Sequence, residues 1–290
     1  MPELPEVETV RRNLEATILR RTITSARLSG KKLRDPISRQ LPRRIQGRRI
    51  ESVHRHGKFL LIHLDHDLTL ISHLGMSGRW LFFERATSSL PHVHVVVTFR
   101  DGSELWFQDP RRFGLIRLTP TSRLSRDPAL MDLGPDPVAT PLRGDWLFER
   151  SRGARAPIKS YLLDQKRIAG IGNIYASEIL HRAGVSPRRQ AGSLTAREWD
   201  AVAAETSRVL GEAIDRMGTT FSMYRTLWNE PGTYGDQLLV YDRAGEPCRR
   251  CGGVIRRIVQ GQRSTFYCPR CQSVRRRRPA LSIARGQSGA

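Results

Sequence analysis

The chain has 290 residues, which is long enough for two domains with separate hydrophobic cores. It carries 49 Lys and Arg against 28 Asp and Glu, a formal charge of +21, and this excess indicates a polyanionic partner such as nucleic acid. The acidic N-terminus and the lack of any apolar run of about 18 residues argue against a secreted or membrane protein, so we expect a cytoplasmic, nucleoid-associated one.

The first eight residues, MPELPEVE, place a proline directly after the initiator methionine. Loss of Met1 would leave the Pro2 nitrogen as a secondary amine, which condenses with an aldehyde carbon to a cationic iminium, an electron sink. The pKa of an α-amino group, about 7.7 to 8.0 against about 10.4 for lysine, makes this amine the better nucleophile at pH 7. The structural alternative is that Pro5 and the neighbouring glutamates simply open a helix.

Apolar residues at helical spacing from Val7 to Ile18 predict an N-terminal amphipathic helix. Short runs rich in β-branched, aromatic or alternating residues then predict eight strands, at 23–29, 49–54, 58–64, 68–73, 79–83, 93–99, 104–108 and 114–118. This pattern is typical of an antiparallel β-sandwich. We therefore predict an α+β multidomain chain whose N-terminal helix and sandwich form a catalytic domain over 1–135.

The next segment, 119–150, is rich in Pro, Gly and Asp, and we predict loop there, with a linker at 136–150. Beyond it the periodicity becomes helical, and a capping box from Thr195 to Glu198 opens a helix that runs to about Met217. The segment GIGN at 170–173 breaks two helices, and its backbone amides and the Asn173 side chain can hold a phosphate. A plain turn between helices is the alternative. We expect a helical DNA-binding domain over 151–235.

All four cysteines lie in one short segment, as two C-x-x-C pairs with sixteen residues between them. They are Cys248, Cys251, Cys268 and Cys271. This spacing predicts a tetrahedral site for one structural Zn²⁺, which supplies the folding energy that so small a module lacks. Two disulfides are the alternative, and a reducing compartment disfavours them.

Between the cysteine pairs, residues 254–255 and 265–267 are predicted to form two strands joined by a turn at Gly261, with Arg263 near the tip. Segment 236–290 contains twelve Arg and three acidic residues, a net charge of +9. We therefore expect a zinc finger over 236–272 that faces phosphates. The basic stretch over 273–290 is expected to be a disordered tail.

Five motifs occur in order: MPELPEVE at 1–8, HLGMSG at 73–78, DPRRFG at 109–114, GIGNIYA at 170–176, and the zinc hairpin. Together they resemble the formamidopyrimidine-DNA glycosylase family, bacterial base-excision enzymes that remove 8-oxoguanine and ring-opened purines. The resemblance runs from residue 1 to about 272 and implies a helix-two-turn-helix domain with a zinc-ribbon β-hairpin. Related endonuclease VIII enzymes act mainly on oxidised pyrimidines and usually have Gly where this chain has Leu4, which favours the purine enzyme.

The resemblance implies a bifunctional glycosylase and AP lyase. Pro2 is expected to attack the sugar C1′ and expel the base, while Glu3 donates a proton during ring opening; the resulting Schiff base allows β- and then δ-elimination. Lys58 matches the family's lysine near the lesion phosphate. Arg263 matches its zinc-finger arginine, which is assigned to δ-elimination, and Glu6 is expected to support the terminal amine.

The resemblance also implies that the damaged nucleotide leaves the base stack and that side chains fill the gap. Met76, Arg111 and Phe113 match the filling residues, and Arg111 can hydrogen-bond the orphaned cytosine. The positions that match the family's DNA contacts are His92, Arg111, Arg155 and Asn173. Asp242 stands where Gly is more usual, and the loop 218–225 corresponds to the segment that covers the flipped base.

The expected partner is double-stranded DNA with oxidised bases or abasic sites, bound by a monomer. Three alternatives remain: an endonuclease VIII-like glycosylase for oxidised pyrimidines, a non-catalytic damaged-DNA-binding protein on the same scaffold, and a zinc-ribbon module of the ribosomal or transcriptional kind. Joint retention of Pro2, Glu3, Lys58 and Arg263 argues against the second. The third leaves the N-terminal motif unexplained.

Overall fold

The computed structural model describes residues 1–85, 90–220 and 224–273, so the tail from 274 onward and part of the predicted covering loop lie outside the described residues. The chain opens with α1 (Leu4–Ile18), as its apolar spacing predicts. The short helix α2 (Leu41–Ile45) was not predicted from the sequence. All eight predicted strands are confirmed: β1 (Ile23–Leu28), β2 (Ile50–His56), β3 (Phe59–Leu64), β4 (Leu68–His73), β5 (Arg79–Phe83), β6 (Val93–Phe99), β7 (Glu104–Gln108) and β8 (Leu115–Pro120).

The strands form two four-stranded antiparallel sheets, in the orders β1-β6-β7-β5 and β2-β3-β4-β8. Residues from both sheets share one hydrophobic core, in which the Trp80 and Phe107 rings lie 5.0 Å apart. The two sheets share this core because one face of each sheet turns its apolar side chains toward the other sheet, whereas Phe59, Ile71 and Leu115 pack in a separate cluster. The predicted antiparallel sandwich is therefore confirmed.

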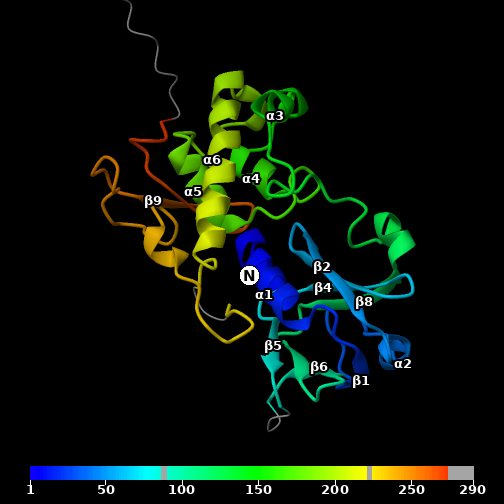
Figure 1. Cartoon of the computed structure of the whole chain (residues 1–290). Coiled ribbons are helices and arrows are strands. Elements are labelled where there is room, and N and C mark those ends of the chain that lie inside the picture. Colours follow the sequence, from blue (N-terminus) through cyan, green and yellow to red (C-terminus); the bar gives the residue numbers. More distant parts are fainter. Residues whose placement is uncertain (86–89, 221–223, 274–290) are drawn as a thin grey trace, which may run out of the picture.

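Helix α1 lies between the sandwich and the helical part of the chain (Figure 1). Val7, Leu14 and Ile18 are buried in the core of the sandwich, whereas Leu4 belongs to the core of the helical part. The first turn of α1 thus stands at the junction of the two cores. This position brings the N-terminus of the chain against residues that follow it by about 170 positions.

The helical part contains α3 (Gly144–Ser151), α4 (Ile158–Leu163), α5 (Asn173–Arg182) and α6 (Ala196–Asp215), with 3-10 turns at Ala191–Ser193 and Tyr234–Gln237. A further 3-10 turn, Thr121–Arg126, packs against β4 and β8 of the sandwich. Helix α6 opens with the predicted capping box: the Thr195 N–H donates to Glu198 Oε2 (2.8 Å), and the Glu198 N–H donates to Thr195 Oγ1 (3.3 Å). Trp199, on its inner face, is fully buried against Tyr161.

The segment 119–150, predicted to be loop, contains a 3-10 turn and most of α3, so the prediction was wrong there. Helix α3 packs against α6, and Leu147 is fully buried in the helical core. An eight-residue helix has little stability of its own and forms because of such packing, which local composition does not reveal. The domain boundaries at 135 and 150 stay predictions.

The cysteine-rich segment forms the antiparallel hairpin of β9 (Arg256–Gln260) and β10 (Arg263–Tyr267), and Arg263 pairs with Gln260 across its tip as predicted. The predicted first strand at 254–255 was wrong. Val254 makes only an isolated bridge to Pro247, and Ile255 is buried before the strand begins. The strand instead begins two residues later and includes Ile258 and Val259, neither of which is buried.

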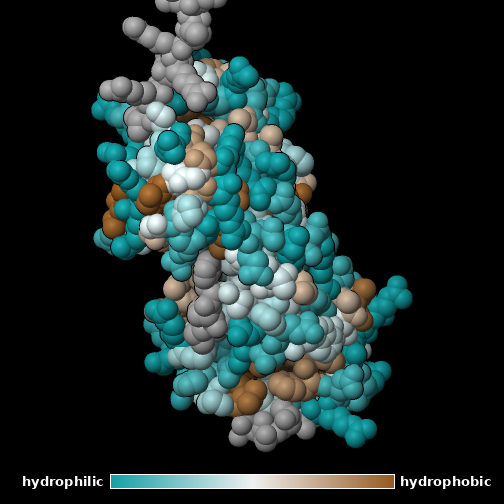
Figure 2. All heavy atoms as spheres, turned by 90° about the vertical axis from the view of Figure 1, so that its left-hand side faces the viewer, coloured by the Kyte–Doolittle hydropathy of each residue, from teal (hydrophilic) through white to brown (hydrophobic). Residues whose placement is uncertain are grey.

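Figure 2 shows an upper helical lobe and a lower sandwich lobe, both covered mainly by hydrophilic residues on the face that it presents. Within the three described stretches, no helix has the length and apolar character needed to cross a membrane.

Candidate active site and zinc centre

Glu3 precedes α1 and is held by the beginning of α5. Its carboxylate accepts hydrogen bonds from the backbone N–H groups of Ile174 (3.0 Å) and Tyr175 (3.4 Å). These N–H groups have no partner inside their own helix, and they lie at the positive end of the α5 dipole. Glu3 is only 3% exposed, so the helix end provides the polar partners that a buried carboxylate needs.

The predicted double turn does separate α4 from α5. Gly172 is required there, because a Cβ atom at this position would lie 2.2 Å from Glu3 Cδ. The N–H groups that bind Glu3 belong to the two residues after this turn, and phosphate binding by the backbone amides of 170–173 stays a prediction. The Asn173 side chain turns to the zinc hairpin, where Nδ2 donates to the Ser264 carbonyl oxygen (3.0 Å).

A pocket of about 580 Å³ opens beside the N-terminus. Met1 lines it and is 45% exposed, whereas Pro2 is buried and its nitrogen is an amide while Met1 is present. The other lining residues are Glu3, Met76, Asn173, Ile174, Tyr241, Asp242, Arg263 and Ser264. Removal of Met1 would therefore convert the Pro2 nitrogen into an amine next to this pocket.

Lys58 lies between β2 and β3 and is 6% exposed. Its Nζ donates to the Ile171 carbonyl oxygen (3.1 Å). Burial lowers the pKa of Lys58, the charge of Glu3 opposes this shift, and the charge of Arg263 adds to it. Lys58 thus lies within electrostatic reach of both residues, and the structure gathers the predicted catalytic residues around one site.

Glu6 is buried in the first turn of α1. Its Oε2 accepts the Glu3 N–H (2.7 Å), while its Oε1 accepts the Thr219 N–H (2.7 Å) and the Tyr175 hydroxyl. Burial and then the charge of Glu3 raise the pKa of Glu6 to about 7, so protonated and ionised forms coexist at neutral pH. Its support of the terminal amine stays a prediction.

Lys159, which was not predicted as a site residue, lies on α4 and is 1% exposed. Its Nζ donates to the Ser264 carbonyl oxygen and to Thr265 Oγ1, both at 2.8 Å, and so ties α4 to the zinc hairpin. Burial lowers the pKa of Lys159 to about 7; Glu3 opposes this shift and Arg263 adds to it. The rarity of lysine, with five in the chain against 44 Arg, was the available signal.

The predicted void-filling residues lie on two adjoining turns. Met76 is 40% exposed and Phe113 is 46% exposed, and the Arg111 guanidinium lies 4.9 Å from the centre of the Phe113 ring. Gly75 has a φ of +61°, and a Cβ atom there would lie 2.4 Å from the Phe113 carbonyl carbon. The close approach holds the Met76 turn against the Phe113 turn, and entry of these side chains into a base stack stays a prediction.

Asp109 fixes these turns through buried hydrogen bonds. Its Oδ1 accepts the Ser77 hydroxyl (2.5 Å), and its Oδ2 accepts the Gly114 N–H (2.7 Å). The Asp109 N–H donates to the His92 carbonyl oxygen (2.9 Å), so His92 lies beside the same turns. Arg155 is exposed between α3 and α4 and does not line the pocket.

We expect His73, at the start of the Met76 turn, to make the stability of the fold depend on pH. Burial, Arg34 and Lys58 lower its pKa from 6.5 to about 3, and its Nδ1 accepts the Gly75 N–H (2.9 Å). Below pH 6.5 the His73 ring takes up a proton in the unfolded chain but stays neutral in the folded chain. The free energy of unfolding therefore decreases as the pH decreases. His73→Asn keeps an acceptor but cannot ionise.

Between pH 7 and pH 5, we expect the unfolding free energy of the unsubstituted chain to fall by about 2 kcal/mol more than that of His73→Asn. Urea unfolding of both proteins at the two pH values measures this difference. Equal pH dependence in the two proteins would show that His73 is not the titrating group.

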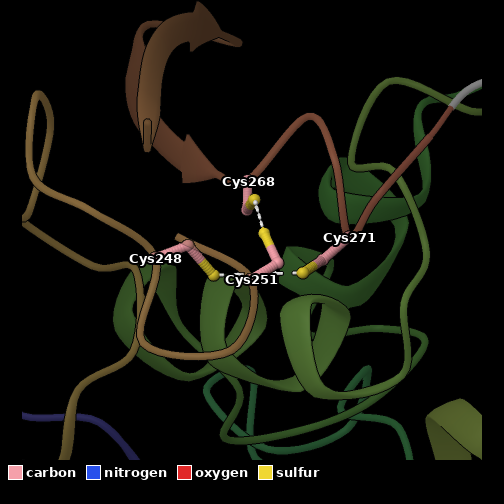
Figure 3. Close-up of side chains that lie close together, drawn as sticks. All are labelled: Cys248, Cys251, Cys268 and Cys271. Carbon is pink, nitrogen blue, oxygen red and sulfur yellow. Dashed lines mark hydrogen bonds between the residues drawn. The ribbon is translucent and has the colours of Figure 1, made fainter. Parts of the chain in front are cut away.

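The four cysteine side chains converge from the two knuckles toward a common centre (Figure 3). Their sulfur atoms all lie within 4.8 Å of one another, and the nearest pair, Cys251 and Cys268, is 3.4 Å apart. This exceeds the bond length of about 2.05 Å in a disulfide, and all four cysteines are free thiols. Four thiolates in this arrangement suit a closed structural zinc site, so the donor set fits the predicted Zn²⁺.

Models of known protein families match most of the chain. Three family models match in order: the formamidopyrimidine-DNA glycosylase N-terminal domain at 1–116, the H2TH domain of the same enzyme at 133–225, and a zinc finger found in FPG and IleRS at 245–274. Formamidopyrimidine-DNA glycosylase of Dinoroseobacter shibae is 42% identical, over 94% of this chain and 100% of that protein. The chain belongs to the formamidopyrimidine-DNA glycosylase family.

Other relatives agree with this membership. The glycosylase of Chloroflexus aggregans is 44% identical over 94% of this chain and 98% of that protein. Among solved structures, a mutant Lactococcus lactis FPG in complex with Fapy-dG-containing DNA matches with a TM-score of 0.87 at 32% identity, over 94% of this chain and all of that chain. The family's zinc-finger model covers the four cysteines, so the chain holds one structural zinc ion.

Proposed function

We propose that this glycosylase removes oxidised purines from double-stranded DNA and then cuts the abasic strand, through a Schiff base at Pro2. The observation that carries the proposal is the pocket at the N-terminus, which brings the Pro2 position and Glu3 together with Arg263, beside the buried Lys58. Family membership supports the enzyme class, a DNA glycosylase of base excision repair with AP lyase activity.

In the first step, the Pro2 amine attacks the sugar C1′, and the bond from C1′ to the damaged base breaks. Glu3 then takes the proton that the Pro2 nitrogen loses and donates it to the ring oxygen as the sugar opens, and the nitrogen becomes an iminium. Two backbone N–H groups of α5 hold the Glu3 carboxylate in place for this transfer. Lys58, fixed on the Ile171 carbonyl oxygen, supplies positive charge for the phosphate at the lesion.

The iminium withdraws electrons from the sugar, so a proton leaves C2′ and the 3′-phosphate is expelled by β-elimination. A second elimination expels the 5′-phosphate and leaves a one-nucleotide gap. A guanidinium group is a poor proton donor, so the role of Arg263 is to hold the phosphate and stabilise its developing charge. Lys159 and Asn173 hold the neighbouring Ser264, and they thereby position Arg263 over the pocket.

The same proposal assigns DNA recognition to the exposed turns. Met76 and Phe113 enter the gap left by the flipped nucleotide, and Arg111 pairs with the orphaned base. The remaining predicted DNA contacts are His92, Arg155 and Asn173. We further propose that the enzyme acts as a monomer at the nucleoid.

Oxidised pyrimidines are a second candidate substrate class. A solved structure of wild-type Lactococcus lactis FPG, with a TM-score of 0.86 and 32% identity to this chain, holds DNA that contains an oxidised pyrimidine. A related fold therefore accommodates such a lesion, and the assay of this enzyme has to compare both classes.

The test is borohydride trapping and strand cleavage on matched duplexes that contain 8-oxoguanine, a formamidopyrimidine, an oxidised pyrimidine or an abasic site. We expect a covalent adduct at Pro2, cleavage on both sides of the lesion, and faster reaction with the purine lesions than with the pyrimidine. Faster reaction with the pyrimidine lesion would reverse the substrate assignment. Absence of any adduct from the Met1-free, zinc-loaded protein would indicate a non-catalytic DNA binder.

A further inference from the structure

Helix α5 contacts the zinc-binding part of the chain at three levels along its length. At its first turn, Asn173 binds the hairpin backbone at Ser264. Further along, the buried Glu178 carboxylate accepts backbone N–H groups from the segment leading into the first knuckle, those of Leu239 (2.8 Å), Val240 (3.0 Å) and Tyr241 (2.8 Å). At the last turn, His181 reaches the metal site itself, so one helix spans the distance from the reaction pocket to the zinc.

The imidazole of His181 lies against a zinc ligand. Its Nε2 is 3.4 Å from the sulfur of Cys248, and the two residues are 1% and 2% exposed. A zinc-bound thiolate has no proton to give, so a hydrogen bond between these atoms requires the proton to be on Nε2. His181 Nδ1 is buried, and within the described part of the chain it has no hydrogen-bond partner. The lack of a partner indicates that Nδ1 carries no proton, because a buried N–H group without a hydrogen bond costs more free energy than a buried ring nitrogen without one.

We propose that His181 is a positioning residue of the zinc site, whose Nε2–H donates to the zinc-bound thiolate of Cys248. The hydrogen bond stabilises the negative charge on the sulfur and orients Cys248 toward the metal. It also attaches the metal site to α5, the helix whose other end holds Glu3. Partners of metal ligands of this kind typically change metal affinity by about 10- to 100-fold when they are removed.

The position of His181 on the helix supports this assignment. It follows Glu178 by three residues, so both side chains project from the same face of α5 toward the zinc-binding segment. Cys248, Val240 and Phe266 are buried in a small core of their own, which is too small to hold the knuckles in place without the metal. An apolar residue at 181 would fill the same space but would leave the thiolate without its donor.

The test measures zinc retention by full-length, zinc-loaded protein. Zinc release to a chromogenic chelator is followed for the unsubstituted chain, His181→Phe and His181→Gln. We expect His181→Phe to bind zinc about 10- to 100-fold more weakly. The amide of His181→Gln can place an N–H near the position of Nε2, so its zinc affinity is expected to stay close to that of the unsubstituted chain. Ile179→Val, a cavity control in the same helix, should also retain zinc normally.

Normal zinc affinity in His181→Phe would overturn the proposal. Equal weakening in His181→Phe and His181→Gln would do the same, because the shape of the ring, and not its N–H, would then be what matters. A measurement on the unsubstituted, zinc-loaded protein does not depend on how the variants fold: the ¹⁵N shifts of the His181 ring report its tautomer. We expect the proton on Nε2, and a proton on Nδ1 would rule out the hydrogen bond to Cys248.

Discussion

A protein that retains a residue in front of Pro2 is expected to form no covalent adduct with abasic DNA in the presence of borohydride. An amide nitrogen has no available electron pair for attack on C1′, and Met1 also lines the pocket that the sugar has to enter. The yield of adduct should fall by at least about 1000-fold, the effect expected when a catalytic nucleophile is removed. Gel shift of the trapped complex and peptide mapping provide the measurement.

The matched control is the same protein carrying an N-terminal tag that a protease removes to leave Pro2 as the first residue. Before cleavage it should be inactive, and after cleavage it should form the adduct at Pro2. Two lysines could act as the nucleophile in place of Pro2. Lys58 and Lys159 are buried near the pocket with lowered pKa values, and an adduct on either of them in the blocked protein would reassign the nucleophile.

Replacement of a zinc ligand should have the second large effect. Cys268 is fully buried, and Cys268→Ser leaves three thiolates where the metal requires four. Zinc supplies roughly 10 to 16 kcal/mol to small modules of this type, so we expect the hairpin to lose its structure and Arg263 to leave the pocket. Incision of abasic DNA should fall by about 100-fold or more.

Zinc content by atomic absorption and incision kinetics measure this effect together. Val259→Ser is the matched control, since Val259 is 66% exposed on the same hairpin and lies away from the metal ligands; both readouts should remain normal. The sandwich should also keep its stability in Cys268→Ser, because its core is separate from that of the zinc module. Full incision by zinc-free Cys268→Ser protein would show that the reaction does not depend on the metal.

The parts of the fold that were predictable from sequence are those with a local periodic signal. The eight strands are rich in β-branched, aromatic or alternating residues, many of which pack into the core of the sandwich, and α6 has both a capping box and an apolar face. The four cysteines specify their site by spacing alone. Helix α3 and the first hairpin strand carry no such signal, since packing against α6 stabilises one and pairing with β10 stabilises the other.

The candidate site was predictable in its residue types but not in its contacts. Motif resemblance pointed to Glu3 and Asn173, yet the binding of Glu3 to the first amides of α5 depends on a contact between distant parts of the chain. Lys159 and His181 were missed for the same reason: each acts through a partner on the zinc-binding segment. No short stretch of sequence records such pairs.

The burial of Pro2 and the docking of Glu3 onto α5 also constrain the order of events during synthesis. The Glu3 to Ile174 contact joins residues 171 positions apart, so the N-terminus cannot dock until α5 has left the ribosome. At about 5 to 20 residues per second, this interval lasts roughly 10 to 30 seconds. During that time Met1 and Pro2 are unprotected, so we expect an aminopeptidase that removes Met1 to have its easiest access to the nascent chain then.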